Sequence, residues 1–147
     1  MSITVIAHNI RSLYNVGSIF RNSAAFNIEK LYLTGFTATP PRKEIAKVAL
    51  GAQDIVNWEQ GEIFDVINNL KGKGYSVYGL EQGKGSIMLD EFVEVEKLVI
   101  ILGNEVEGIN KEVIQELDGL IEIPMGKKRS LNVAVASGIV MHTLMSL

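Results

Sequence analysis

Strand-like and helix-like segments alternate along the whole chain, and this alternation limits its fold more than any other feature. Short apolar runs predict strands at residues 3–7, 30–33, 55–58, 75–80, 97–102 and 120–123. Helical spacing predicts helices at residues 16–26, 42–50, 62–70, 109–117 and 131–147, with Asn15 as N-cap of the first. We therefore expect an α/β domain with a mainly parallel sheet of about six strands, covered by helices on both faces.

Length and composition narrow the class further. The 147 residues suit a single domain, residues 1–147, with a sizeable core. The net charge of -3 argues against indiscriminate nucleic-acid binding but allows a local basic patch. Cysteine is absent and the two histidines, His8 and His142, lie far apart, so we expect no metal site. The first residues do not resemble a signal peptide, and residues 131–147 are too short and interrupted for a membrane span, so we expect a cytoplasmic protein.

Three loops fall where a ligand is expected, because open parallel sheets bind ligands beyond the carboxyl ends of their strands. They are residues 9–17, 103–108 and 124–132. The first leads into "NVGSIFRNSAAF" (15–26), the second is "LGNEVEGI" (102–109), and the third lies in "IPMGKKRSLNV" (123–133). Each has a plain structural explanation as well: an exposed arginine on a helix, a turn that leads into a helix, and Ser130 as a helix N-cap.

Together, and in this order, the three segments resemble the motifs of the SpoU branch of the SPOUT superfamily. Its members are RNA ribose 2′-O-methyltransferases that use S-adenosylmethionine. The similarity lies in Asn15-Val16-Gly17 with Arg21, in Leu102-Gly103-Asn104-Glu105 with Gly108-Ile109, and in Ile123-Pro124-Met125 with Ser130-Leu131-Asn132-Val133. Residues 37–52 also resemble the tRNA-type members. Four residues, "GKKR", separate the halves of the third motif, one fewer than the family pattern has.

The resemblance implies a fold, a cofactor and partners. It implies a C-terminal trefoil knot, a single methyltransferase domain without an appended RNA-binding domain, S-adenosylmethionine as cofactor, and RNA as substrate, with tRNA favoured over rRNA. It also implies a homodimer. Residues 131–147 favour the dimer independently, because a helix that is apolar on nearly every side must be buried on more than one face. We expect Val140 and Leu144 in that interface, opposite the helix 16–26 of the partner.

The resemblance also implies the site residues. The catalytic set is Arg21, Asn15, Glu105, Ser130 and Asn132. Arg21 would bind RNA phosphate and polarise the ribose hydroxyl, because an arginine does not readily serve as a base. How the hydroxyl proton leaves stays open. The expected cofactor-binding set is Leu80, Gly103, Asn104, Gly108, Ile123, Met125, Ser130 and Leu131.

Cations near the third motif are candidates for RNA binding. The expected set is Lys127, Lys128, Arg129, Arg11, Arg42 and Lys43, which would contact phosphates and set affinity rather than sequence choice. A solvated basic loop is the plain alternative for residues 127–129. Two other functions remain open: a non-catalytic RNA-binding or scaffold relative of the same fold, and a flavodoxin-like nucleotide-binding domain. The second lacks both a phosphate loop and a dinucleotide fingerprint.

Overall fold

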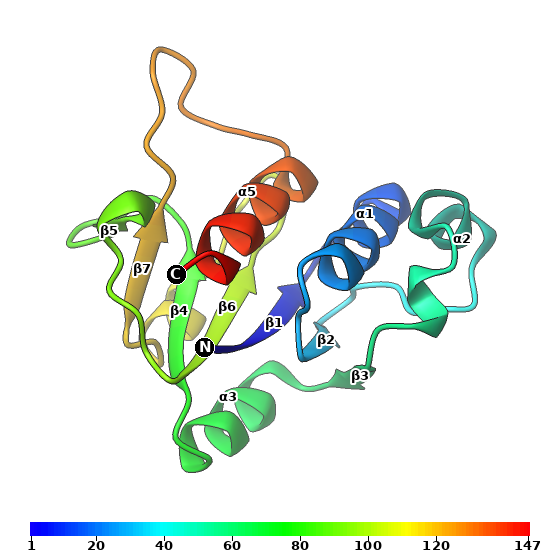
Figure 1. Ribbon diagram of the computed structural model, residues 1–147, viewed down its shortest axis with the longest axis horizontal. Coiled ribbons are helices and arrows are strands. Elements are labelled where there is room, and N and C mark those ends of the chain that lie inside the picture. The colour runs from blue at the N-terminus through cyan, green and yellow to red at the C-terminus, as the bar shows by residue number, and fades with distance from the viewer.

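The computed structural model describes residues 1–147 and shows a parallel sheet between two layers of helices (Figure 1). The strands are β1 Ser2–His8, β2 Lys30–Thr34, β3 Trp58–Gly61, β4 Ser76–Leu80, β5 Ile87–Met88, β6 Lys97–Leu102 and β7 Gly119–Glu122. They form one seven-stranded sheet in the order β3-β2-β1-β6-β4-β7-β5, and every neighbouring pair is parallel. The predicted α/β class with a parallel sheet is confirmed. The additional strand is β5, whose two residues are too short for a recognisable apolar pattern.

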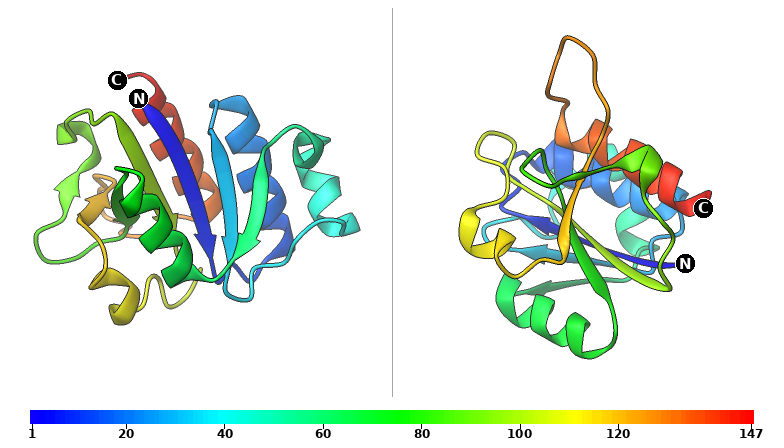
Figure 2. Two further views of the ribbon diagram at one scale, coloured as in Figure 1. Left: turned by 90° about the horizontal axis from the view of Figure 1, so that it is seen from below. Right: turned by 90° about the vertical axis from the view of Figure 1, so that its left-hand side faces the viewer.

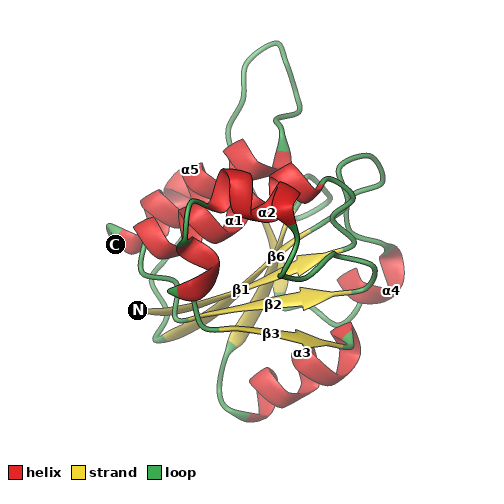
Figure 3. Ribbon diagram, turned by 90° about the vertical axis from the view of Figure 1, so that its right-hand side faces the viewer, coloured by secondary structure: helices red, strands yellow, loops and turns green.

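Helices cover both faces of the sheet, as Figure 3 shows. They are α1 Leu13–Ala25, α2 Lys43–Ala49, α3 Ile63–Gly72, α4 Lys111–Ile114 and α5 Val133–Met145, with short 3-10 turns at Ala52–Asp54 and Leu89–Glu91. α1, α2 and α5 lie on one face, and α3 and α4 lie on the other. None of these helices has both the length and the apolar character that crossing a membrane requires.

The strands supply a core on each face because successive side chains point to opposite sides of the sheet. In β6, Leu98, Ile100 and Leu102 belong to the larger cluster of 25 buried residues, under α1, α2 and α5. Val99 and Ile101 belong to the cluster of 11 residues under α3 and α4. This two-sided burial explains why "KLVIIL" is apolar without alternation.

Three predicted element positions need correction. α1 begins at Leu13, and its N-cap is Ser12 rather than Asn15, because the Ser12 side chain accepts the Asn15 backbone N–H at 3.2 Å. The short strand expected at 55–58 is Trp58–Gly61, since Ile55 lies in an exposed turn with 76% of its surface accessible. α4 is only four residues long, shorter than the predicted 109–117.

Gly17 of the first motif has a packing role in this fold. It is buried in α1, and a Cβ atom placed there would lie 2.6 Å from the backbone oxygen of Ile45 in α2. Only glycine allows α1 and α2 to approach this closely. The close packing fixes the position of α1, whose N-terminal end borders the candidate site.

The carboxyl ends of the strands carry the three loops at one edge of the molecule. Figure 2 shows the two chain termini side by side near the amino ends of the strands, away from these loops. The loop of residues 124–132 projects furthest from the body (Figure 1). The sheet thus gathers segments that are far apart in sequence, as expected for an open parallel sheet.

Candidate active site

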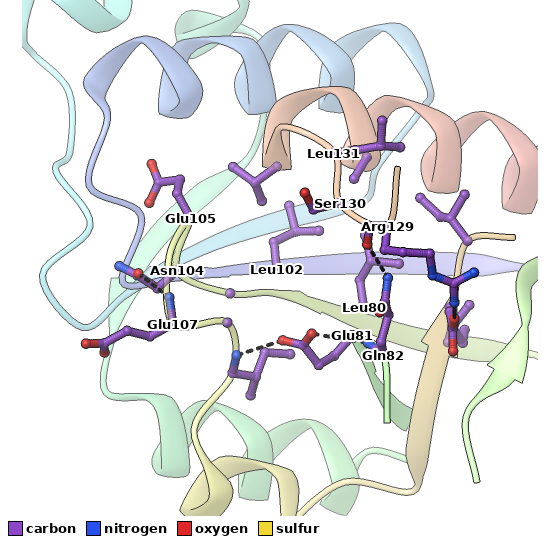
Figure 4. A pocket seen from close by; sticks show the side chains of 18 of the residues that line it. Leu80, Glu81, Gln82, Leu102, Asn104, Glu105, Glu107, Arg129, Ser130 and Leu131 are labelled. Atoms are coloured by element: carbon purple, nitrogen blue, oxygen red, sulfur yellow. Dashed lines mark hydrogen bonds and ion pairs between the residues drawn. The ribbon is translucent and has the colours of Figure 1, made fainter. Parts of the chain in front are cut away.

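A cavity of about 500 Å³ lies at the carboxyl ends of β4, β6 and β7, beneath the loop of residues 124–132 (Figure 4). All eight residues of the expected cofactor-binding set line it: Leu80, Gly103, Asn104, Gly108, Ile123, Met125, Ser130 and Leu131. In Figure 4, Asn104, Glu105 and Glu107 stand at one end, and Gln82 and Arg129 at the other. Eleven of the 21 lining residues are hydrophobic, so the cavity combines apolar walls with polar ends.

The loop of residues 103–108 is held in a tight turn by its own backbone. The Asn104 N–H donates to the Gly108 carbonyl at 3.2 Å, and the Gly108 N–H donates to the Asn104 carbonyl at 3.0 Å. A Cβ at Gly103 would lie 2.7 Å from the carbonyl carbon of Gly108, and Gly108 has a φ of 68°. Both glycines are therefore required by the turn itself.

The side chain of Asn104 organises the same turn. Its Oδ1 accepts the backbone N–H groups of Val106 and Glu107, each at 2.9 Å. Its Nδ2 donates to the carbonyl of Asn9 at 2.8 Å, which ties the turn to the end of β1. Asn104 lines the cavity, but its amide is already engaged in holding the loop.

Glu105 joins this turn to the start of α1. Its carboxylate accepts the backbone N–H groups of Arg11 at 2.8 Å and Ser12 at 2.9 Å, and the side-chain amide of Asn15 at 3.0 Å. Burial by itself raises the pKa of Glu105, but these three donors outweigh it, so the pKa lies below that of an ordinary glutamate. Glu105 is thus a carboxylate held ionised by its hydrogen bonds.

Asn132 extends the network to the third motif. Its Nδ2 donates to Oδ1 of Asn15 at 3.3 Å. Its Oδ1 accepts the N–H groups of Ala134 at 2.8 Å and Val135 at 3.2 Å, so Asn132 is the N-cap of α5. The plain alternative for Ser130, a helix N-cap, is therefore wrong. Ser130 is instead exposed and lines the cavity.

Arg21 lies apart from the other expected catalytic residues within a single chain. It is exposed on α1, and it is neither among the cavity-lining residues nor in an ion pair. Glu105, Asn15 and Asn132 form a continuous hydrogen-bonded set, whereas Arg21 makes no hydrogen bond to it. The structure thus assembles the motif residues except for Arg21.

The six expected RNA-binding cations have different surroundings. Lys127 and Lys128 are exposed at the tip of the projecting loop, and Arg11 and Lys43 are also exposed. Arg42 lies 3.8 Å from Glu44. Arg129 lines the cavity, and its Nη2 lies 3.3 Å from Oε2 of Glu122.

Several cavity residues were not predicted from the sequence, and three polar ones among them are Glu81, Gln82 and Glu122. Glu81 accepts the backbone N–H of Ile109 at 3.1 Å and so holds the end of the 103–108 turn. The signal for Glu122 was available, since a carboxylate inside the apolar run "LIEIP" needs a partner. No comparable pattern marks Glu81 or Gln82, which follow β4 in a polar loop.

Both histidines lie outside the cavity. His8 is buried, and its Nδ1 lies 2.8 Å from the Thr34 hydroxyl. Burial lowers the pKa of His8, although the carboxylate of Glu62 opposes this effect. His142 is exposed on α5, and its ring stands edge-on to Phe26 with centroids 5.6 Å apart. Neither histidine therefore belongs to the candidate site.

Comparison with known proteins assigns the family. The family model described as "SpoU rRNA Methylase family" matches residues 2–142. A mouse tRNA (guanosine(18)-2′-O)-methyltransferase is 30% identical over 141 residues, which cover 93% of this chain and 9% of that protein. The tRNA (guanosine(18)-2′-O)-methyltransferase of Aquifex aeolicus is 28% identical, with 95% of this chain and 67% of that protein covered.

Solved structures agree with the sequence matches. The AdoMet-bound rRNA methyltransferase of Sinorhizobium meliloti superposes with a TM-score of 0.92 at 25% identity, covering 99% of this chain and 56% of that chain. The A. aeolicus TrmH/SpoU tRNA modifying enzyme gives a TM-score of 0.87 at 26% identity, covering 99% of this chain and 74% of that one. The chain thus spans only part of the length of its relatives. Because the family model matches nearly every residue, this chain belongs to the SpoU rRNA methylase family.

Proposed function

We propose that this chain is an S-adenosylmethionine-dependent RNA methyltransferase that methylates a ribose 2′-hydroxyl, with tRNA favoured over rRNA as substrate. The observation that carries the proposal is the cavity itself, around which all eight expected cofactor-binding residues converge. The AdoMet in the S. meliloti relative supports the cofactor. The name of the A. aeolicus relative supports the ribose 2′-hydroxyl and tRNA.

The cavity suits S-adenosylmethionine in size and charge. Its volume of about 500 Å³ falls within the range of small-molecule sites. Glu81, Glu105, Glu107 and Glu122 line it, against Arg129 as the one cation. This excess of carboxylates favours a ligand with a positive centre, and the apolar walls favour its adenine. When bound, the cofactor supplies the activated methyl group.

Residues of this chain would position the acceptor. Asn15 and Asn132 are held at the start of α1 and of α5 by their mutual hydrogen bond, and Glu105 fixes Asn15. Such orientation lowers the barrier to transfer by holding the reacting groups in line. Arg21 would bind an RNA phosphate and polarise the hydroxyl, since a guanidinium stays protonated and does not readily serve as a base.

A homodimer is part of the proposal, and a surface groove supports the place proposed for its interface. The groove lies between α1 and α5 and is lined by Ser18, Asn22, Phe26, Ala134, Val135, Gly138, Ile139 and His142. Within the groove, Val135 and Ile139 of α5 are 52% and 38% exposed. We propose that a second copy covers this surface and that Arg21 of one subunit serves the cavity of the other. The trefoil knot implied by the family resemblance also stays part of the proposal.

The positions expected in the dimer interface, Val140 and Leu144, are wrong. They are 0% and 1% exposed, because they face the core beneath α5. Ile139→Asp is the proper test, with Val93→Asp as its control, since Val93 is 79% exposed and lies outside the groove. Light scattering at low micromolar concentration should show a wild-type dimer that Ile139→Asp dissociates and Val93→Asp leaves intact. A monomeric wild type would refute the dimer.

Methyl transfer itself is tested with labelled S-adenosylmethionine and RNA from cells that lack the protein, followed by nuclease digestion. The product should be a 2′-O-methylated nucleotide. Arg21→Ala should abolish transfer while calorimetric binding of S-adenosylhomocysteine stays unchanged. Lys73→Ala serves as a surface-cation control, because Lys73 is exposed at the end of α3, on the other face of the sheet. RNA binding without transfer by the wild type would favour the scaffold function. Methylation at a base would refute the ribose assignment.

A further inference from the structure

Glu122 is a carboxylate in an unusual place, at the last position of the buried strand β7. Only 7% of its surface is exposed. Ser86 donates its hydroxyl proton to Oε1 of Glu122 at 2.7 Å, and Arg129 donates from Nη2 to Oε2 at 3.3 Å. A carboxylate removed from water needs such partners, because an unpaired buried charge is strongly destabilising. Arg129 is therefore required by the carboxylate beneath it.

Hydrogen bonds hold both the side chain and the backbone of Arg129. Its Nη1 donates to the carbonyl of Met125 at 3.4 Å, and its own carbonyl accepts a hydrogen bond from Nε2 of Gln82. The contact with Met125 closes the loop on itself, so residues 126–128 form the projecting tip. Since Gln82 comes from the segment after β4, Arg129 joins two loops that are distant in sequence.

The three consecutive cations thus lie in two different environments. All three side chains are exposed, but Lys127 and Lys128 form no ion pair, whereas Arg129 is paired with Glu122 and is the one cation lining the cavity. An exposed lysine gains from neutralising an RNA phosphate, while Arg129 would first have to leave a buried carboxylate. Lys127 and Lys128 are therefore free to bind phosphate, whereas Arg129 is already engaged by Glu122.

We propose that Arg129 and Glu122 form a positioning pair that fixes the loop of residues 124–132 over the cofactor cavity, and that of the three consecutive cations only Lys127 and Lys128 contact RNA. The loop contributes Met125, Ser130 and Leu131 to the cavity wall, so its shape determines how well the wall closes. Both members of the pair line the cavity, and the role proposed for them is to hold its wall in place. This role rests on the proposed function, because it concerns the affinity of that cavity for S-adenosylmethionine.

The test compares Arg129→Gln with Lys128→Gln in two measurements on the full chain. Binding of S-adenosylhomocysteine by calorimetry should weaken about tenfold in Arg129→Gln, as expected for losing hydrogen bonds to a charged group, and stay unchanged in Lys128→Gln. The salt dependence of RNA binding should instead change in Lys128→Gln and not in Arg129→Gln. Its slope should fall by about one counterion in Lys128→Gln and stay unchanged in Arg129→Gln.

Two further variants separate the pair from a general loss of folding. Glu122→Gln combined with Arg129→Gln should weaken binding no more than either change alone, because each removes the same interaction. Arg129→Lys keeps the charge beside Glu122 and should recover part of the affinity. A salt slope reduced in Arg129→Gln with unchanged cofactor affinity would make Arg129 an RNA contact and overturn the proposal, as would simple additivity in the double variant.

Failure of the proposed function gives a different result. A wild-type protein that binds no S-adenosylhomocysteine would refute the cofactor assignment, and the pair is then judged from hydrogen exchange of the 124–132 amides. Faster exchange in both Arg129→Gln and Glu122→Gln, with Lys128→Gln unchanged, supports the positioning pair. Equal exchange in all the variants and the wild type overturns it.

Discussion

Glu105 is the residue at which the arrangement of the site can be tested most directly, by the change Glu105→Gln. The carboxylate accepts three hydrogen bonds, from the N–H groups of Arg11 and Ser12 and from the amide of Asn15. A glutamine has one acceptor oxygen and places an NH₂ group where the other oxygen was. If its oxygen serves Ser12 and Asn15, the NH₂ group faces the Arg11 N–H, and at least one hydrogen bond is lost.

The expected loss of stability follows from this count. A hydrogen bond to a charged group contributes about 1.5–3 kcal/mol. Arg11 is exposed, so water replaces part of what its N–H loses. We therefore expect the free energy of unfolding to fall by about 1.5 kcal/mol, the lower end of that range. Glu107→Gln is the matched control, because Glu107 is exposed in the same loop and its carboxylate accepts no hydrogen bond.

The assay is urea unfolding followed by circular dichroism for the wild type and both variants across the acid range. A carboxylate whose pKa is lowered by folding stabilises the folded state above its unfolded pKa and loses this effect as pH falls through the folded pKa. The difference in free energy of unfolding between the wild type and Glu105→Gln should therefore persist at neutral pH. It should disappear only below the ordinary glutamate pKa of about 4.3. Equal stability of Glu105→Gln and Glu107→Gln at neutral pH would refute the reasoning.

Three other changes probe the scaffold of the site. Gly17→Ala should lower the free energy of unfolding by about 1–3 kcal/mol, because its Cβ would lie 2.6 Å from the Ile45 backbone oxygen. An unchanged midpoint of urea unfolding would contradict the close packing. Asn132→Ala should cost about 1 kcal/mol through loss of the α5 N-cap, and Asn132→Ser should recover most of it, whereas equal losses would exclude a capping role. The free energy of unfolding of the wild type should decline as pH falls below about 6.5, because buried His8 resists protonation. His8→Gln should remove this pH dependence. If the variant keeps it, the pH dependence comes from other groups.

The sequence predicted the elements whose signal is local. The run "KLVIIL" marks a buried strand whatever its neighbours are, and a parallel sheet then places the loops that follow its strands at one edge. This is why the eight expected cofactor-binding residues converge on one cavity. β5 escaped prediction because two residues show no period, and its pairing with β7 depends on the tertiary fold.

Predictions were less accurate where they depended on the tertiary surroundings of a residue. α5 is apolar all round, so its sequence does not distinguish Val140, which faces the core, from Ile139, which faces solvent. Asn15 and Ser12 are both good N-cap residues, and only the backbone conformation selects Ser12. Arg129 was grouped with its lysine neighbours because its pairing with Glu122 requires the loop to fold back on β7.

The placement of the chain termini has a practical consequence for work with this protein. Figure 2 shows both ends side by side at the amino ends of the strands, whereas the residues that line the cavity follow the carboxyl ends. A purification tag, a fluorescent reporter or a surface anchor attached at either end would leave the approach to the 124–132 loop clear. Immobilisation through the termini would therefore present the cavity outward, toward a ligand arriving from solution.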